Sequence, residues 1–278
     1  MPFSVGFGLG VTSDSNPLHI IFAFVSFSCW MSFCFVVNAI GDKDVDKFHN
    51  GRSKDMNLAY QPLVTGEVTE KAAFYLNMMV FFCSLLFASF INFLFFILIL
   101  LVDIVGYIYS MPPTRFKTTP AGDIICNALA AGAIFMAGLS IGGANMNPFM
   151  ILGAFIMGAI FYIPTVVTDY EFDKKAGLNT SAVFFGPKKI LRVVYLLSTI
   201  LMIIELIVFL TSNLELKVLA LLIIMYAIVI TLASNIKLKE KRLYIHENWI
   251  LVPFALISSA FVTYGILKLV GWFILYSS

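Results

Sequence analysis

Long apolar stretches, each about the length of a membrane-spanning helix, recur along the whole chain and leave few alternatives for its fold. Windows of about 20 apolar residues fall at 19–40, 72–90, 93–110, 121–143, 147–168, 190–211, 215–234 and 249–271. Of the 278 residues, 60% are hydrophobic and only 12% are charged. A soluble domain has too little interior to bury so much apolar surface. The sequence therefore predicts an all-α membrane protein with a bundle of eight full transmembrane helices.

A shorter apolar stretch at residues 3–11 precedes these eight segments and ends at the turn-forming sequence TSDSNP. It has about half the length that a spanning helix needs. It also lacks the charged start and the small-residue cleavage site of a signal peptide. We interpret it as a truncated first helix of a nine-helix bundle, and we expect residues 1–278 to form a single transmembrane domain.

Basic residues gather in alternate connections between the predicted helices. All Lys and Arg residues except Lys217 and Lys268 lie in or beside the connections that follow the first, third, fifth and seventh segments. The positive-inside rule then predicts a multi-pass protein of the cell membrane with these connections in the cytoplasm. The net charge of +2 is too small to indicate a nucleic-acid partner.

Two pairs of aspartates end two of the apolar segments. Asp42 and Asp46 occur in NAIGDKDVDK, and Asp169 and Asp173 occur in TDYEFDKKAG. A spacing of four residues places both carboxylates of a pair on one helix face, with Cβ atoms about 5–6 Å apart. Asn38 lies one turn before Asp42 and adds another oxygen to that face. Such oxygens suit Mg²⁺, which takes one or two carboxylates and completes its coordination with water and substrate phosphate.

A third polar group lies between the aspartate pairs, in YSMPPTRFKTTP. Pro112 and Pro113 interrupt the helix, so Arg115 and Lys117 are expected on a short turn at the same membrane surface as the aspartates. Arg can bind phosphate oxygens through two N–H groups, and Lys adds a point charge. These cations would hold the oxygens of a diphosphate that face away from bound metal. The alternative is that they only anchor the chain at the membrane surface.

Together, the three motifs resemble those of the UbiA-type family of intramembrane prenyltransferases, over nearly the whole chain. The first motif, Asn–Asp–x–x–Asp–x–x–x–Asp, is matched by Asn38, Ala39, Asp42 and Asp46; the second by Asp169, Asp173, Lys174, Gly177 and Thr180; and the segment between them by Tyr109, Ser110, Pro112, Pro113, Arg115 and Lys117. Two positions differ from the family: Ala39 replaces a usual Asp, and Gln61 stands where many members have Arg.

The resemblance implies a nine-helix fold with a central cavity that opens to the cytoplasm, beneath cap loops at about 41–71 and 169–189. It also implies Mg²⁺-dependent transfer of a prenyl group from a prenyl diphosphate donor to a lipophilic acceptor, through ionisation to an allylic carbocation. The partners would be the donor, the acceptor and membrane lipid. The metal ligands would be Asn38, Asp42, Asp46, Asp169 and Asp173, and the diphosphate would bind Arg115, Lys117 and Lys174. The acceptor stays open between a polyene and an aromatic quinone precursor.

Two residues within apolar segments join the four motif aspartates as candidate catalytic groups. Tyr109, like Tyr107 and Tyr162, could shield the carbocation with its ring, although core packing explains each ring equally well. Asp103 lies at a depth where an ionisable group is costly. It would position the acceptor or take the proton lost after alkylation, or it would form a structural hydrogen bond to a neighbouring helix. Glu205, which matches no motif, is expected to be structural.

Other functions remain open at this level. A transporter would also use membrane carboxylates, but it would hold them near the midplane on interrupted helices rather than at helix ends. A non-catalytic lipid-binding relative and an intramembrane terpene cyclase share the same motifs. A CDP-alcohol phosphotransferase is a weaker match because its Asp-Gly-x-x-Ala-Arg signature is missing. The Cys and His residues show no ligand spacing, so no zinc, haem or thiol chemistry is assigned.

Overall fold

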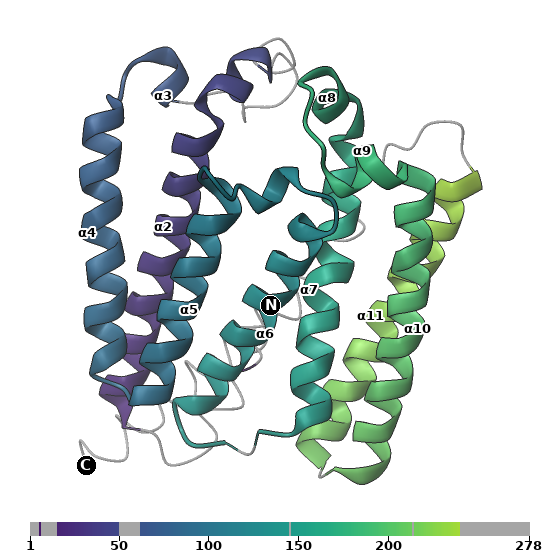
Figure 1. Ribbon diagram of the computed structural model, residues 1–278. Helices are drawn as coiled ribbons and strands as arrows, with labels where there is room; N and C mark the ends of the chain where they lie inside the picture. Colours follow the sequence, from purple (N-terminus) through teal and green to yellow (C-terminus); the bar gives the residue numbers. More distant parts are fainter. Residues whose placement is uncertain (1–5, 7–15, 50–61, 145, 213, 240–278) are drawn as a thin grey trace.

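All regular elements in the described part of the chain are helices (Figure 1). The structure is a computed structural model that describes residue 6 and residues 16–49, 62–144, 146–212 and 214–239. In chain order the elements are α2 (Pro17–His49), α3 (Pro62–Thr65), α4 (Glu70–Ser89), α5 (Phe93–Ser110), η2 (Phe116–Thr118), α6 (Gly122–Ser140), α7 (Pro148–Thr168), α8 (Tyr170–Lys175), α9 (Ser181–Phe185), α10 (Pro187–Thr211) and α11 (Leu214–Lys239).

Six of these helices, α2, α4, α5, α6, α7 and α10, are long and apolar enough to cross a membrane. The described apolar part of α11, Leu219–Leu232, is shorter. Helices therefore occupy the first seven predicted segments, and α5 has the predicted bounds. The predicted segment 249–271, and the stub 3–11 apart from Gly6, lie outside the described residues. The count of nine helices stays a prediction.

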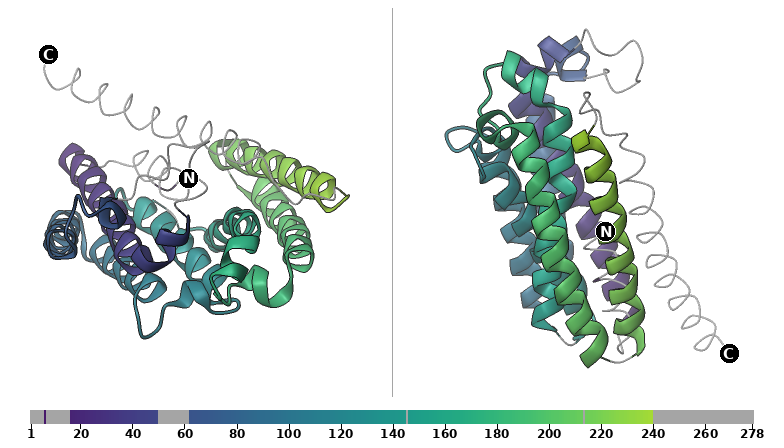
Figure 2. Two further views of the ribbon diagram at one scale, coloured as in Figure 1. Left: turned by 90° about the horizontal axis from the view of Figure 1, so that it is seen from above. Right: turned by 90° about the vertical axis from the view of Figure 1, so that its right-hand side faces the viewer.

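Seen from above, the described helices form an arc that runs from α4 to α11 (Figure 2). α2 packs against α4 and α5, and the neighbouring pairs that follow are α5 with α6, α6 with α7, α7 with α10, and α10 with α11. Large apolar side chains such as Phe82 on α4, Phe93 on α5 and Leu196 on α10 are more than half exposed. Outward apolar side chains of this kind suit contact with lipid tails.

Two apolar cores lie inside the arc and share α6. One core contains Phe135 and Leu139 of α6 together with residues of α7, α10 and α11. The other contains Ala133, Ile134 and Ala137 of α6 together with residues of α2, α4 and α5. One face of α6 thus packs in the core formed with α7, α10 and α11, and another face packs in the core formed with α2, α4 and α5.

Polar side chains at the helix starts set the short connections between spans. Thr69 caps α4 by accepting the Ala72 N–H at 3.2 Å, and Asn92 caps α5 by accepting the Phe95 N–H at 2.8 Å. Asn92 also donates to the Ser140 carbonyl at 2.8 Å, which ties the start of α5 to the end of α6. Caps of this type satisfy N–H groups that have no partner within the helix.

The three polar motifs lie at one end of the bundle, the upper end in Figure 1. This end holds the C-terminal part of α2, the connection from α5 through η2 to α6, and α8. α2 continues as a helix to His49, nine residues beyond the predicted apolar segment that ends at 40. The sequence prediction that the motifs share one face is therefore matched by the arrangement of the helices.

Candidate active site

The first motif lies on α2 where this helix comes close to the end of α5. A Cβ on Gly41 would lie 2.6 Å from the Ser110 carbonyl oxygen, so only a glycine permits this approach of the two backbones. Asn38 and Asp42, one turn apart, face the same region. The Ser110 hydroxyl donates to the Asn38 side-chain oxygen at 3.2 Å. Asp46 belongs to α2 as well, but its side chain lies outside the described part of the structure.

The connection after α5 brings two cations onto this motif. Arg115 has a left-handed backbone conformation, with φ at 40°, and Lys117 follows within η2. Arg115 Nη2 donates to Asp42 Oδ1 at 3.1 Å and to the Gly41 carbonyl at 2.9 Å. Lys117 Nζ forms an ion pair with the same Asp42 oxygen and donates to Asn38 Oδ1 at 3.1 Å. The two cations thus contact the carboxylate motif directly, and Lys117 is almost fully buried there.

The second motif spans the junction of α7 and α8. α7 ends at Thr168, Asp169 keeps a helical backbone, and the Asp173 N–H donates to the Asp169 carbonyl at 2.9 Å. Asp173 is 9% exposed and accepts the Thr180 hydroxyl at 3.0 Å, whereas Asp169 is exposed. The two aspartates remain one turn apart, as the spacing predicts. Lys174 is exposed, and its Nζ lies 5.7 Å from the centre of the Tyr170 ring.

A buried carboxylate that the sequence reading did not single out supports this second motif. Asp123, in the first turn of α6, accepts the Ser181 N–H at 2.9 Å, the Ser181 hydroxyl, and the Ile124 N–H at 2.8 Å. The Ser181 hydroxyl oxygen also accepts the Ala121 N–H at 2.8 Å. Because Ser181 follows Thr180, Asp123 fixes the segment that holds Asp173. The signal that could have found it is an ionisable residue within a predicted apolar segment, here 121–143, which is the signal that singled out Asp103.

Two tyrosines lie between the halves of the site. The Tyr109 and Tyr162 hydroxyls are 3.3 Å apart. Asp42 lies within electrostatic range of Tyr109, and Asp173 lies within range of Tyr162. Tyr107, by contrast, is 47% exposed and does not line the cavity described next.

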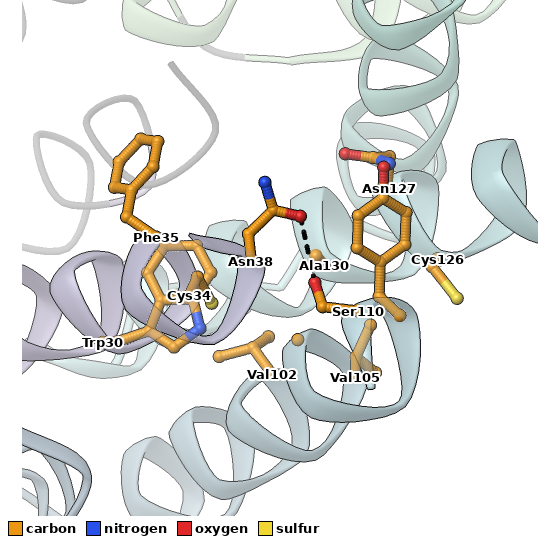
Figure 3. A pocket seen from close by; sticks show the side chains of 12 residues that line it. Trp30, Cys34, Phe35, Asn38, Val102, Val105, Ser110, Cys126, Asn127 and Ala130 are labelled. Atoms are coloured by element: carbon orange, nitrogen blue, oxygen red, sulfur yellow. Dashed lines mark hydrogen bonds between the residues drawn. The ribbon is translucent and has the colours of Figure 1, made fainter. Parts of the chain in front are cut away.

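An apolar cavity of about 290 Å³ extends from the first motif into the bundle (Figure 3). It is lined by residues of α2, α5 and α6, with Asn38, Tyr109 and Ser110 at the polar end. Trp30 and Val102, which lie eight residues before Asn38 and Ser110 on the same helices, line its other end, and Ala130 of α6 also lines it. The arrangement places an apolar space directly beneath a paired carboxylate and two cations.

Asp103 and Glu205 lie apart from this cavity. Asp103 accepts the Ser84 hydroxyl at 3.0 Å, and the Ser84 carbonyl accepts the Ser26 hydroxyl at 2.8 Å. This buried chain joins α5, α4 and α2, so the structural hydrogen bond weighed as an alternative for Asp103 is present. Glu205 is buried on α10, and its Oε1 would lie 2.6 Å from a Cβ placed on Gly153 of α7.

The oxygen donors of the two motifs fit Mg²⁺ better than a fully protein-coordinated metal. Within the described ranges, no three His, Cys, Asp or Glu side chains lie close enough together to hold an ion. The donors are Asn38 and Asp42 in one half and Asp169 and Asp173 in the other. Mg²⁺ is ordinarily bound by one or two carboxylates together with substrate phosphate and water. Gln61, one of the two departures from the family pattern, lies outside the described residues, and Ala39 offers no ligand.

Comparisons with known proteins point to one family. A sequence profile described as the UbiA prenyltransferase family matches residues 1–243. A solved UbiA homologue from Archaeoglobus fulgidus, bound to DMAPP and Mg²⁺, is 46% identical, with a TM-score of 0.90 over 96% of this chain and 93% of that one. The structure of a UbiA homologue from that organism bound to GPP and Mg²⁺ gives 44% identity and a TM-score of 0.89 over the same shares.

Curated relatives are more distant. A digeranylgeranylglyceryl phosphate synthase from Pyrococcus horikoshii is 25% identical over 173 residues, which are 62% of this chain and 58% of that protein. A lycopene elongase/hydratase from Haloarcula japonica is 29% identical over 156 residues, which are 55% of this chain and 50% of that protein. The chain thus spans between 50% and 58% of the length of these two curated relatives.

Proposed function

Because the chain belongs to the UbiA prenyltransferase family, we propose that it transfers a prenyl group from a prenyl diphosphate to a lipophilic acceptor in a Mg²⁺-dependent reaction. The observation that carries the proposal is the contact of Arg115 and Lys117 with Asp42 above an apolar cavity. The diphosphate head would lie among these charges, and the prenyl chain would extend into the cavity. Homologues solved with DMAPP or GPP and Mg²⁺ support this choice of donor and metal.

The residues that would hold Mg²⁺ are Asn38, Asp42, Asp46, Asp169 and Asp173. When bound, the metal supplies Lewis-acid stabilisation of negative charge on the diphosphate. Lys174, which is exposed beside Asp173, would contact the outer face of the diphosphate. Asp123 would keep the second half in place through Ser181 and Thr180.

Arg115 and Lys117 would stabilise the leaving group. As the bond between C1 and oxygen breaks, the electron pair stays with the diphosphate, whose added charge the two cations neutralise. The remaining allylic carbocation would lie near Tyr109, whose ring can stabilise positive charge. The apolar wall of the cavity keeps water from quenching the cation. A carbon of the acceptor then forms the new bond, and a proton is lost to a base.

The orientation and the cap belong to the same proposal. By the positive-inside rule, the end that carries the motifs would face the cytoplasm. The loops at about 41–71 and 169–189 would cover the site during the reaction. The acceptor we propose is a lipid or a polyene rather than a water-soluble compound. The cavity is apolar, one relative is named for the lipid it makes, and another is named for the polyene lycopene.

The test is to incubate the purified protein with Mg²⁺, labelled prenyl diphosphates of several lengths, and candidate polyene, lipid and aromatic acceptors. Diphosphate release and a new labelled lipid are expected for the wild type. Both should be lost in Asp42→Ala and Asp173→Ala but retained in Glu171→Ala, a control that removes an exposed acid beside the second motif. An intact donor under all conditions, together with ion flux in liposomes, would instead support a transporter.

A further inference from the structure

We propose that Asn127 and Tyr162 are positioning residues that hold the Tyr109 ring at the cavity wall, where it separates the allylic cation from water. This inference rests on the proposed function, since the cation forms only if the protein ionises a prenyl diphosphate. Neither positioning residue belongs to the three motifs.

Tyr109 lies where the polar and the apolar parts of the site meet. It is the second-to-last residue of α5, and it lines the cavity together with Ser110 and Asn38. Asp42 lies within electrostatic range of its hydroxyl. Because C1 of a donor is bonded to a diphosphate oxygen, a cation released beside these charges forms at the level of this ring.

Side chains from two other helices hold the Tyr109 hydroxyl. It donates to the Tyr162 hydroxyl of α7 at 3.3 Å, and the Asn127 side chain of α6 also interacts with it. Asn127 lines the cavity (Figure 3), whereas Tyr162 does not. The effect of Tyr162 on a bound prenyl chain therefore passes through the Tyr109 ring.

The two partners of this hydroxyl are themselves fixed in place. Asn127 Nδ2 donates to the Asp123 carbonyl, one turn earlier on α6, at 2.9 Å. Tyr162 lies one turn after Gly158, where α7 comes so close to α6 that a Cβ would lie 2.5 Å from the Ala131 Cβ. Small residues at such a crossing let two membrane helices approach each other. The crossing thereby sets the positions of both partners relative to each other.

The position of the ring decides whether it can protect a cation. An aromatic face attracts a cation that lies within about 6 Å of the ring centre. A tyrosine whose hydroxyl has lost its partners can turn to another staggered rotamer, which moves the ring away from the wall. Water then reaches the cation from the polar end of the site. Its oxygen bonds to the cation and a proton passes to solvent, so the donor ends as a prenyl alcohol and diphosphate.

Positional isotope exchange measures this competition without an acceptor. Geranyl diphosphate carries an oxygen isotope label at the atom that bridges C1 and phosphorus. When the C1–O bond breaks and forms again on the protein, the label spreads to the non-bridging oxygens. The exchanged donor and the prenyl alcohol are both quantified after incubation with the purified protein in Mg²⁺. The ratio of alcohol to exchanged donor reports how well the cation is separated from water.

The wild type should exchange the label and form little alcohol. Tyr162→Phe and Asn127→Leu should each raise the ratio of alcohol to exchanged donor about three- to tenfold, the factor that corresponds to one neutral hydrogen bond. Tyr109→Phe should raise the ratio as well, and in that background neither change should add a further effect, because the shared hydroxyl is gone. Tyr75→Phe, the same change at an exposed tyrosine of α4, should leave the wild-type ratio.

A wild-type ratio in the folded Tyr162→Phe and Asn127→Leu proteins would overturn the inference. An Asn127→Leu effect that persists in the Tyr109→Phe background would overturn it too, since Asn127 would then act on the substrate directly. Tyr162→Phe, which keeps the ring and its packing, gives an independent answer if Asn127→Leu does not fold. A wild type that neither exchanges the label nor forms alcohol would instead count against the proposed function itself.

Discussion

Asp123 holds Ser181, 58 residues further along the chain, through both the backbone N–H and the hydroxyl of that serine. The residue before it, Thr180, donates its hydroxyl to Asp173 at 3.0 Å. The start of α6 is thereby connected to the second aspartate motif by two hydrogen bonds from Ser181 to Asp123 and one from the adjacent Thr180 to Asp173. This connection gives Asp123 a positioning role that can be tested separately from the motif residues.

Asp123→Asn should reduce catalytic efficiency and raise the Mg²⁺ concentration needed for half-maximal activity. The substitution weakens hydrogen bonds to a charged acceptor, which contribute about 1.5–3 kcal/mol each, so a reduction of roughly ten- to hundredfold is expected. Ser181→Ala should act in the same direction, while Thr199→Ala, which alters an exposed hydroxyl on α10, should have no effect. A lower melting temperature with an unchanged Mg²⁺ dependence would mean that Asp123 only stabilises the fold.

Mg²⁺ and diphosphate should bind cooperatively. Asp42 Oδ1 accepts from both Arg115 and Lys117, so the carboxylate is neutralised by the cations that would bind phosphate. A diphosphate draws these cations to itself and leaves Asp42 available to a metal. Inorganic diphosphate should therefore raise Mg²⁺ affinity by about 5- to 150-fold, and Mg²⁺ should raise diphosphate affinity by the same factor.

Calorimetric titrations of each ligand with and without the other test this coupling, after correction for the complex that forms in solution. Asp42→Asn should abolish most of the coupling. Equal Mg²⁺ affinities in the presence and absence of diphosphate would contradict the prediction.

Arg115 and Lys117 should affect donor use in different ways. Lys117→Gln removes a buried charge that contacts Asn38 and Asp42, so kcat should fall and donor KM should rise, with a combined loss of roughly a hundredfold. Arg115→Lys keeps the charge but loses two-point binding of phosphate, and it should mainly raise KM. Steady-state kinetics with one donor and varied Mg²⁺ measure both effects.

Lys43→Gln is the matched control for these cations. Lys43 follows Asp42 directly, yet it pairs with Glu70, whose side chain is 63% exposed. Exposed ion pairs contribute about 0–1 kcal/mol, and Lys43→Gln should leave the kinetics unchanged. A loss as large as that of Lys117→Gln would show that general surface charge, and not contact with the motif, controls donor binding.

Asp103→Asn should keep turnover, because an amide can still accept from Ser84 and Asp103 does not line the cavity. Asp103→Leu should lower the melting temperature only slightly, since the Ser84 hydroxyl can still donate to the Phe81 carbonyl, 2.8 Å away. Turnover assays and thermal unfolding in detergent separate the two effects. A folded Asp103→Asn protein without turnover would support the proton-accepting role considered from the sequence.

Glu205→Gln should likewise leave activity unchanged, because Glu205 packs between α10 and α7 away from the motifs. Gly153→Ala should be destabilising by about 1–3 kcal/mol, since the new Cβ would lie 2.6 Å from Glu205 Oε1. Melting temperatures of the single and double variants measure this contact. Lower activity in Glu205→Gln at an unchanged melting temperature would contradict a structural role.

Local signals in the sequence predicted much of the fold. α5 begins after Asn92 and ends before Pro112, so a cap and a helix breaker fix its bounds as predicted. α2 extends well past its predicted end because hydropathy detects where a helix leaves the apolar layer, and the helix itself continues through NAIGDKDVDK. The shared end of the three motifs followed from the order of the spans.

Contacts between distant residues could not be predicted in the same way. Lys117 reaches Asn38, 79 residues before it, because Gly41 lets α2 approach the end of α5. The sequence suggested that Lys117 meets phosphate, but not that it pairs with Asp42. Asp123 was missed because its role depends on Ser181, which no spacing rule links to it.

The position of α6 in both apolar cores has a consequence for how the chain can be divided. A break in the connection after α6, at residues 141–147, would leave the fragment with α7, α10 and α11 without Phe135 and Leu139, which complete its core. That fragment should not be stable alone in a membrane, whereas the two fragments produced together should reassemble. The helices on the two sides of α6 should therefore fold only together, because α6 contributes to the apolar core on each side.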